Sequence, residues 1–465
     1  MNELITLTTE DLLNLLNERK YTAFRDQIDE LTSIDAAELL SELPADRLPV
    51  VFRVLKKDAA AAIFAELESE QQTAVINGLT DREISRMLEE LYIDDTVDML
   101  EEMPASIVSR IMKSASPEMR TEINRFLAYP EDSAGSVMTS EFIDLRRDMT
   151  CEEAVARIRK IGLDSETVYV AYVTDAARVL MGVVPLKQLL FTPPEQKIGD
   201  VMNENVIFAY THDDKEEVAN TISRYDILAL PIVDKEKRLV GLVTVDDAMD
   251  VIEAEATEDI EKMAAMLPTD KTYMRTGVWE TFSKRFPWLL LLMVTATFTS
   301  TIITHYETAI GTYAILTAFF PMLMGTGGNA GGQSSVAIIR ALSLGEVEMK
   351  DVLRVLWKEL RVAFICGLAL AAATFVKVML IDFRLRFTEI SPTGVVQNNL
   401  LLALIISITV FFAVLVAKAV GALLPIGAKR IGLDPAVMAS PFITTIVDTL
   451  TLMIYFAIAS SVLQF

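Results

Sequence analysis

One carboxylate, Asp448, stands in an apolar run near the C-terminal end of the chain whose composition is typical of a membrane span. Burying a carboxylate in hydrocarbon is costly, so such a residue usually faces a helix-bundle interior or a watery path. Helical spacing places Ser440, Thr444, Thr451 and Tyr455 on the same face as Asp448. This stripe of polar side chains predicts the wall of an ion path.

A second reading of Asp448 is purely structural. The carboxylate could hydrogen-bond a neighbouring helix, with Lys377 or Lys418 as its partner. The two readings differ in what surrounds Asp448 once the chain has folded.

A glycine-rich run, PMLMGTGGNAGGQSS, ends the second apolar stretch. Such a run weakens a helix, and non-helical backbone at membrane depth is tolerated when it is buried or lines a cavity. We therefore expect the run around Asn329 to lie on the ion path, where freed carbonyls could face a hydrated cation. Close helix packing is the alternative, because Gly327 and Gly331 have GxxxG spacing.

Five apolar stretches are long enough to span a bilayer: 286–304, 309–339, 361–381, 399–424 and 436–463. Lys and Arg beside the spans mark the cytosolic side. Their distribution predicts a multi-pass protein of the cytoplasmic membrane, surrounded by lipid, with cytosolic N-terminal domains and the C-terminus outside. The acidic start of the chain is unlike a signal peptide, which agrees with a cytosolic N-terminus.

Charge is divided unevenly along the chain. Residues 286–465 hold 11 Lys/Arg and 9 Asp/Glu, a net charge of +2. Subtracting these from the totals of 42 and 65 leaves 31 and 56 for residues 1–285, a net charge of −25. With only two histidines and two cysteines, the chain favours oxygen ligands and so Mg²⁺, Ca²⁺ or Mn²⁺. No nucleic-acid partner is expected.

Residues 1–128 show short helical segments opened by Pro, Thr or Asp, which predicts an all-α superhelical domain. An irregular bundle is the alternative. A duplication follows: GSVM at Gly135 and GDVM at Gly199 head two similar segments, 129–192 and 193–252. An acidic connecting helix then occupies 253–275, and a helical pore domain fills 276–465.

Each duplicated segment reads as strand, helix, strand, strand, helix, which resembles the CBS module. The resemblance implies an α/β tandem pair that holds ATP or another adenine nucleotide. In such modules a G-h-h-T-x-x-D stretch contacts ribose and phosphate, and Gly241, Thr244 and Asp247 match it here. The first copy has Pro185 and Gln188 instead, so one nucleotide site is expected.

Four motifs in order, YPEDSAGSVMT, GLVTVDDAMDVIEAEATEDI, PMLMGTGGNAGGQSS and LDPAVMASPFITTIVD, resemble the MgtE family of magnesium channels. The resemblance implies a homodimer whose ion path runs along the dimer axis, walled by the second and fifth spans, and a connecting "plug" helix. It places Asp448 against hydrated Mg²⁺, with Gly325, Gly328, Ser440 and Thr444 nearby. Relatives often have Asn at the positions of Gly332 and Ser440, and Gly at that of Thr451.

Acidic residues crowd the first part of the chain, and like charges this dense repel unless cations lie between them. We therefore expect feedback gating, in which cytosolic Mg²⁺ bridges the helical domain, the CBS pair and the plug and closes the path. The resemblance points to nine sensor residues: Asp94, Asp98, Glu216, Asp226, Asp247, Asp250, Glu255, Glu258 and Asp259.

The sequence thus predicts a Mg²⁺-selective, Mg²⁺-gated channel or transporter for magnesium uptake, and no enzyme. Two alternatives stay open. One is a divalent cation exchanger driven by a proton or sodium gradient, with Asp448 as proton carrier. The other is a membrane-tethered nucleotide sensor that transports nothing, which would leave Asp448 without a purpose.

Overall fold

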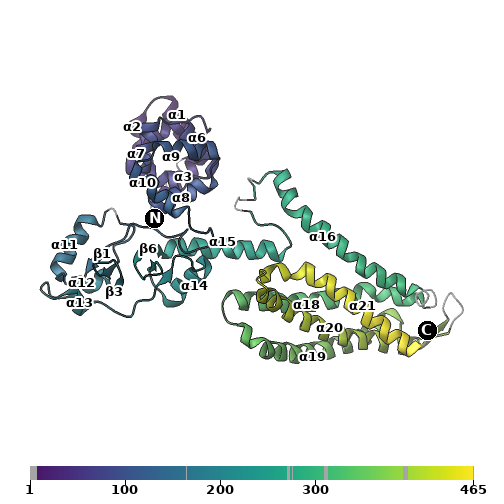
Figure 1. Cartoon of the computed structure of the whole chain (residues 1–465). Helices are drawn as coiled ribbons and strands as arrows, with labels where there is room; N and C mark the ends of the chain where they lie inside the picture. The colour runs from purple at the N-terminus through teal and green to yellow at the C-terminus, as the bar shows by residue number, and fades with distance from the viewer. Residues whose placement is uncertain are drawn as a thin grey trace, which may run out of the picture. The chain divides into compact units, whose positions relative to one another are not determined.

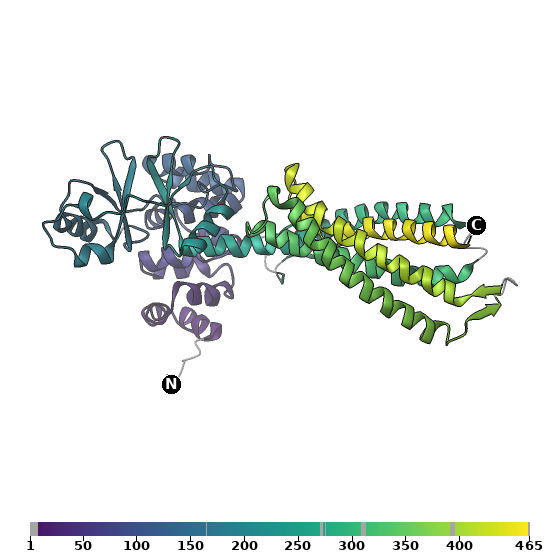
Figure 2. The same cartoon turned by 90° about the horizontal axis from the view of Figure 1, so that it is seen from below.

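The computed structural model describes residues 8–163, 165–269, 273–274, 276–307, 313–390 and 396–463. The chain forms two compact units, Met1–Ile252 and Glu253–Phe465. Figure 1 and Figure 2 show the elements of each unit.

The first unit begins with short α-helices, as the spacing of apolar residues predicts. Threonine or serine side chains cap several of them. The Thr80 hydroxyl oxygen, for example, accepts a hydrogen bond from Glu83 N–H, and the Glu83 carboxylate accepts one from Thr80 N–H. Contacts join helices two or three apart in the chain, such as α4 with α6 and α7 with α9. The helices are α1 (Thr9–Asn17), α2 (Tyr21–Ile28), α3 (Ser33–Ser41), α4 (Leu48–Val54), α5 (Lys57–Ala65), α6 (Ser69–Gly78), α7 (Asp81–Leu88), α8 (Ile93–Glu102), α9 (Ala105–Ser114) and α10 (Pro117–Phe126).

The duplicated segments fold in the predicted order. The first contains β1 (Asp144–Arg146), α11 (Cys151–Ile161), β2 (Val170–Thr174), β3 (Leu180–Pro185) and α12 (Leu186–Phe191). The short helix α13 (Ile198–Val201) precedes the second, which contains β4 (Ala209–Tyr210), α14 (Lys215–Tyr225), β5 (Ala229–Val233), β6 (Leu239–Thr244) and α15 (Val245–Met263). In each three-stranded sheet the first pair is parallel and the second antiparallel.

The two sheets are joined through backbone and side chain. Val179 and Arg238 form an isolated bridge between them. The buried Tyr172 hydroxyl donates a hydrogen bond to the Ala229 carbonyl oxygen at 3.1 Å. Satisfying a buried phenol in this way fixes one repeat against the other.

The predicted connecting helix is not a separate element. It is the second half of α15, which continues without a break from the second repeat and ends at Met263. The remaining elements of the second unit are α16 (Val278–His305), the 3₁₀ helix η1 (Ala314–Phe319), α18 (Phe320–Ser343), η2 (Met349–Asp351), α19 (Val352–Lys377), η3 (Val378–Asp382), the hairpin β7 (Thr388–Ile390) and β8 (Val396–Asn398), α20 (Asn399–Arg430), η4 (Pro435–Met438) and α21 (Ser440–Leu463).

Long apolar helices dominate the second unit. Helices α18, α20 and α21 contact one another, α19 packs on α20, and α16 contacts α21 (Figure 1). In the described residues, four segments are long and apolar enough to cross a membrane: Val278–His305, Met349–Asp382, Asn399–Arg430 and Pro435–Leu463. Helix α18, which holds the glycine-rich run, is not among them. Residues 309–312 of the expected second span lie outside the described residues.

The glycine-rich run does not break its helix, so the expectation of freed carbonyls is wrong. Helix α18 is continuous from Phe320 to Ser343. Its glycines instead allow close packing: a Cβ at Gly331 would lie 2.9 Å from Ile443 Cγ2 and 3.2 Å from the Ala417 carbonyl oxygen. A Cβ at Gly421, on α20, would overlap the Gly331 carbonyl oxygen. Close packing between neighbouring helices holds the run helical.

Candidate ion path and regulatory sites

Helix α18 places its glycines beside Asp448. A Cβ at Gly328 would lie 3.0 Å from Thr444 Cγ2 and 3.6 Å from Asp448 Oδ1. Thr444 and Asp448 are one turn apart on α21, so three of the predicted ion-path residues meet at this contact. The absence of a side chain at Gly328 lets the α18 backbone come close to the carboxylate.

A polar stripe lies on the outer face of α18. Gly325, Asn329 and Gln333, spaced four residues apart, are exposed in the single chain. Gly328, between them, is buried. A helix that exposes glycine and amides among apolar spans has a face suited to water rather than lipid.

The polar residues predicted to share one face of α21 have different surroundings. Tyr455 is fully buried and donates a hydrogen bond to the Leu316 carbonyl oxygen at 3.2 Å. Thr451 is also buried, and its hydroxyl would lie 2.7 Å from a Cβ at Gly327. Both pack against neighbouring elements, so the expectation that they line the path is wrong. The side chain of Ser440 lies outside the described part of the structure.

Neither lysine offered as a structural partner reaches Asp448. Lys377 pairs with Asp382 at 2.8 Å. Lys418 instead approaches Glu359 and Ser334. Within the described residues Asp448 therefore has no cationic partner, and the packing alternative loses its proposed contacts.

An acidic cluster lies between α8 and the start of α15 in the first unit. Burial raises the pKa of Asp94 to about 9, with Asp95 and Asp247 adding repulsion. Burial and Asp247 raise the pKa of Asp95 to about 6. Glu166, which the sequence reasoning missed, joins them, and burial together with Asp247 raises its pKa to about 7. Such carboxyl groups repel one another when ionised.

Other predicted sensor residues of this unit lie around or away from the cluster. Asp98 is exposed on α8, one turn after Asp94, yet it is coupled to the cluster, because desolvation together with repulsion from Glu101, Asp95 and Asp247 raises its pKa to about 7. Asp250 is close enough to raise the pKa of Asp247. Glu216 and Asp226 are at opposite ends of α14 and so about 15 Å apart. Among the described residues, no group of three or more His, Cys, Asp or Glu side chains is arranged to hold a metal directly.

The plug half of α15 contacts the helical region of the second unit. Ser343 Oγ, at the end of α18, donates a hydrogen bond to Asp259 Oδ2 at 3.2 Å. Lys262 Nζ lies 2.6 Å from Asp434 Oδ2 and 2.6 Å from Glu258 Oε1. Glu255, one turn before Asp259, is half-buried.

These contacts shift the pKa values of two charged side chains on the plug, Asp259 and Lys262. Burial raises the pKa of Asp259, and repulsion from Asp434 and Glu258 raises it further. The hydrogen bond from Ser343 acts in the opposite direction and lowers it. Burial alone would lower the pKa of Lys262, but its bonds to Asp434 and Glu258 outweigh burial and raise it. The sequence reasoning missed Lys262 and Asp434. The signal was available, because Lys262 is the only basic residue of α15 and Asp434 lies in one of the quoted motifs.

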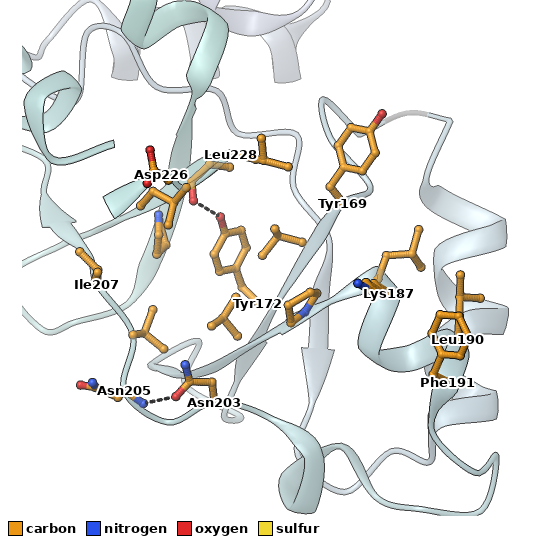
Figure 3. A pocket seen from close by; sticks show the side chains of 18 residues that line it. Tyr169, Tyr172, Lys187, Leu190, Phe191, Asn203, Asn205, Ile207, Asp226 and Leu228 are labelled. Atoms are coloured by element: carbon orange, nitrogen blue, oxygen red, sulfur yellow. Dashed lines mark hydrogen bonds between the residues drawn. The ribbon is translucent and has the colours of Figure 1, made fainter. Parts of the chain in front are cut away.

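A cavity of about 650 Å³ lies between the two repeats and has a mostly apolar lining (Figure 3). Tyr169 and Lys187 from the first repeat and Asp226 from the second line it. Gly241, Thr244 and Asp247 do not. Thr244 is buried and hydrogen-bonded to the Asp247 carboxylate, and a Cβ at Gly241 would lie 2.6 Å from the Thr139 carbonyl oxygen. The predicted nucleotide motif therefore packs away from this cavity.

Comparisons with known proteins agree with this architecture. Three family models match the chain: divalent cation transporter at residues 320–458, MgtE intracellular N domain at 31–132 and CBS domain at 198–254. The magnesium transporter MgtE of Thermus thermophilus is 35% identical over 457 residues, covering 97% of this chain and 98% of that protein. The magnesium transporter MgtE of Bacillus subtilis is 32% identical, covering 97% and 96%.

A solved structure is similar to about half of the chain. The crystal structure of the soluble part of a magnesium transporter is 30% identical with a TM-score of 0.51, covering 53% of this chain and 98% of that chain. Two magnesium transporters are 35% and 32% identical to the chain over nearly their whole length. Together with the family models, these findings show that the chain belongs to the MgtE family, a family of transporters.

Proposed function

We propose that this protein conducts Mg²⁺ passively across a cytoplasmic membrane and is closed by Mg²⁺ on the cytosolic side. The observation that carries the proposal is the meeting of Gly328 and Thr444 with Asp448, beside a polar face of α18. Mg²⁺ gives up its water reluctantly and is usually held through waters by one or two carboxylates. Asp448, without a cationic partner among the described residues, can serve a hydrated cation.

The proposal includes five spans and two chains. Helix α18 has 24 residues, enough to cross about 30 Å of hydrocarbon, and its glycines and serines explain its lower hydropathy. With α16, α19, α20 and α21 it gives an odd number of spans, which places the C-terminus outside. A homodimer would bring the exposed stripes of two α18 helices together and supply two Asp448 carboxylates.

Regulation follows from the two acidic regions. In the first unit, Asp94, Asp95 and Glu166 are costly to ionise together unless a cation neutralises them. Because no direct ligand set is present among the described residues, we infer that Mg²⁺ binds there through its waters. In the second unit, Asp259 and Lys262 hold the plug against the helices. Falling Mg²⁺ would restore repulsion and release the plug.

For the nucleotide, we propose the cavity lined by Tyr169, Lys187 and Asp226. Its volume of about 650 Å³ is in the range of small-molecule sites. A tyrosine can stack on a base, Lys187 can pair with phosphate, and a carboxylate can accept hydrogen bonds from ribose hydroxyls. The domain limits predicted from the sequence, with 129–192 and 193–252 as the repeats, remain part of this proposal.

The deciding experiment compares the wild type with Asp448→Ala and Asp448→Asn in liposomes that contain a Mg²⁺ dye. With only an inward Mg²⁺ gradient, the wild type should carry Mg²⁺ and both variants should lose at least 90% of the flux, a loss of roughly 1.4 kcal/mol or more in ion stabilisation. Asp382→Asn is the control, because Asp382 pairs with Lys377 away from Asp448. Equal flux in all four proteins would remove Asp448 from the path.

The same liposomes separate the alternatives. An exchanger would need a proton or sodium gradient before Mg²⁺ moved. A tethered nucleotide sensor would carry no Mg²⁺ in any gradient, with or without residues 1–275. Passive flux that survives deletion of residues 1–275 and loses its inhibition by Mg²⁺ would support the gated channel.

A further inference from the structure

Three helices of the second unit meet at a buried polar contact that the proposed ion path does not use. Lys418 Nζ, on α20, donates a hydrogen bond to Ser334 Oγ, on α18, at 3.1 Å. Ser334 Oγ in turn donates to Glu359 Oε2, on α19, at 2.6 Å. Ser334 is 2% exposed and Lys418 is 6% exposed. We call these three side chains the serine–charge network.

We propose that the serine–charge network fixes the rotation of α18 and thereby positions its glycine-rich face beside Asp448. Ser334 is then a positioning residue, which acts through α18 and does not touch the ion. The inference rests on the proposed function, in which α18 forms part of the ion path.

The arrangement makes the serine a link between two opposite charges. Lys418 Nζ and Glu359 Oε2 are 3.9 Å apart, so their direct contact is weak compared with the two hydrogen bonds through Ser334. A hydroxyl can accept from the ammonium and donate to the carboxylate at the same time. Turning α18 would break both hydrogen bonds and leave two buried charges poorly paired, which is costly.

The neighbouring contacts explain why α18 needs such a link. One turn away, α18 and α20 meet through Gly331 and Gly421, whose backbones touch. Glycines offer no side chains to interlock, so this contact limits distance but resists rotation poorly. Ser335 adds a second hydroxyl anchor, donating to the Met438 carbonyl oxygen at 3.0 Å, just before α21 begins. Gly328, whose register with Asp448 must be kept, is six residues from Ser334, about 9 Å along the helix.

A contribution to the stability of the fold does not by itself explain why two charged side chains are buried at this contact. Replacing a buried ion pair with apolar side chains of similar volume is often neutral or stabilising, whereas removing one partner is strongly destabilising. An apolar pair should therefore hold α19 and α20 together, but it would leave the Ser334 hydroxyl without either of its partners. This difference lets an experiment separate a positioning role from a packing role.

The test uses the full-length protein in liposomes and four changes. Glu359→Leu with Lys418→Met gives the apolar pair, and Glu359→Lys with Lys418→Glu reverses the charges while keeping both hydrogen bonds with Ser334 available. Ser334→Ala removes only the hydroxyl. Lys377→Met with Asp382→Asn is the matched control, because it removes an ion pair at the end of α19 that is partly exposed.

Two readouts are needed, and only one depends on transport. The first is Mg²⁺ flux down its gradient. The second is the rate at which a water-soluble maleimide labels Gly325→Cys, with Cys151 and Cys366 replaced by alanine. Gly325 lies on the stripe that the proposed ion path uses, and a Cβ there meets no atom of its own chain within 4 Å, so its labelling reports how α18 turns this stripe toward the watery path without requiring conduction.

We expect the apolar pair and Ser334→Ala to fold, to change the labelling rate at least fivefold and to reduce flux at least tenfold. The reversed pair should return both values to within threefold of the wild type, and the control should change neither. If the apolar pair and Ser334→Ala keep wild-type labelling and flux, the network only fills the core and the inference is wrong. If labelling changes as expected while the wild type carries no Mg²⁺, the positioning role stands and the proposed function fails. Should the reversed pair not fold, Ser334→Ala and the apolar pair decide.

Discussion

The Lys262 ammonium lies 2.6 Å from an Asp434 carboxylate oxygen and joins the last turn of α15 to the loop before α21. The same lysine also pairs with Glu258, so it holds two carboxylates together. Met263 packs against the apolar cluster formed by Ile339, Ala436 and Ala439. The plug is thus held by charge, hydrogen bonding and apolar contact together.

This contact predicts how the closed state can be weakened. Lys262→Met or Asp434→Asn should each raise conduction by about two- to fivefold at high internal Mg²⁺, where the wild type is mostly closed, because a partly exposed ion pair contributes about 0.5–1 kcal/mol. The double variant should add little to either single change, since both remove the same interaction. Patch recordings over a series of internal Mg²⁺ concentrations measure this. Lys350→Met, which removes an exposed pair with Glu348, is the control. Independent, additive effects of the two changes would contradict the pairing.

The acidic cluster predicts that the first unit becomes less stable as pH rises. Asp94, Asp95 and Glu166 have pKa values of about 9, 6 and 7, above their ordinary values near 4. The folded cluster therefore binds more protons than the unfolded chain. The contribution of these carboxyl groups to the stability of the folded unit is greatest below pH 4 and is lost as pH rises through these pKa values. Without divalent cations, amide hydrogen exchange in α8, corrected for intrinsic rates, should be faster at pH 8 than at pH 6.

Two additions sharpen this test. Mg²⁺ at pH 8 should slow the exchange again, because it replaces the missing protons. Asp94→Asn should reduce both the pH effect and the Mg²⁺ effect, while Asp35→Asn, on α3 and outside the cluster, should leave both unchanged. Exchange that is independent of pH in the wild type would show that the cluster does not couple ionisation to stability.

Local sequence patterns predicted the elements well because their causes are local. Threonine caps and apolar spacing mark the helices of the first unit, and the duplicated β–α pattern marks the repeats. The glycine-rich run shows the limit of such reasoning. Glycine lowers helix propensity, which argued for a broken helix, but packing of Gly331 on α20 and α21 overrides propensity.

The site was predictable only where one residue carried the signal. Asp448 is conspicuous because its span is otherwise uncharged. The partners of Ser334 were not predictable, because Glu359 and Lys418 are distant in sequence and three-helix packing alone brings them together. The same reason explains Tyr455, which shares the helical face of Asp448 in sequence yet packs on Leu316.

The cavity between the repeats predicts where an adenine nucleotide binds. Lys187→Ala should weaken ATP binding about tenfold, because it removes a charge-assisted contact with phosphate. Thr244→Ala should change it less than twofold, since Thr244 is buried against Asp247 outside the cavity. Calorimetry on the full-length protein in detergent measures both. If Thr244→Ala weakened ATP binding more than Lys187→Ala, the nucleotide site would lie at the Gly241–Thr244–Asp247 motif instead.

Two glycines of one helix offer a matched test of the packing beneath the ion path. A Cβ at Gly421 would overlap the Gly331 carbonyl oxygen, whereas a Cβ at Gly427, also on α20, meets nothing within 4 Å. Gly421→Ala should therefore push α20 away from α18 and lower stability by about 1–3 kcal/mol. Gly427→Ala should leave stability unchanged or raise it by up to about 1 kcal/mol, because alanine favours the helix. Thermal unfolding in detergent compares the two. If the two variants were equally stable, α18 and α20 would not meet through their backbones. The register assigned to Gly328 and Asp448 would then lose its support.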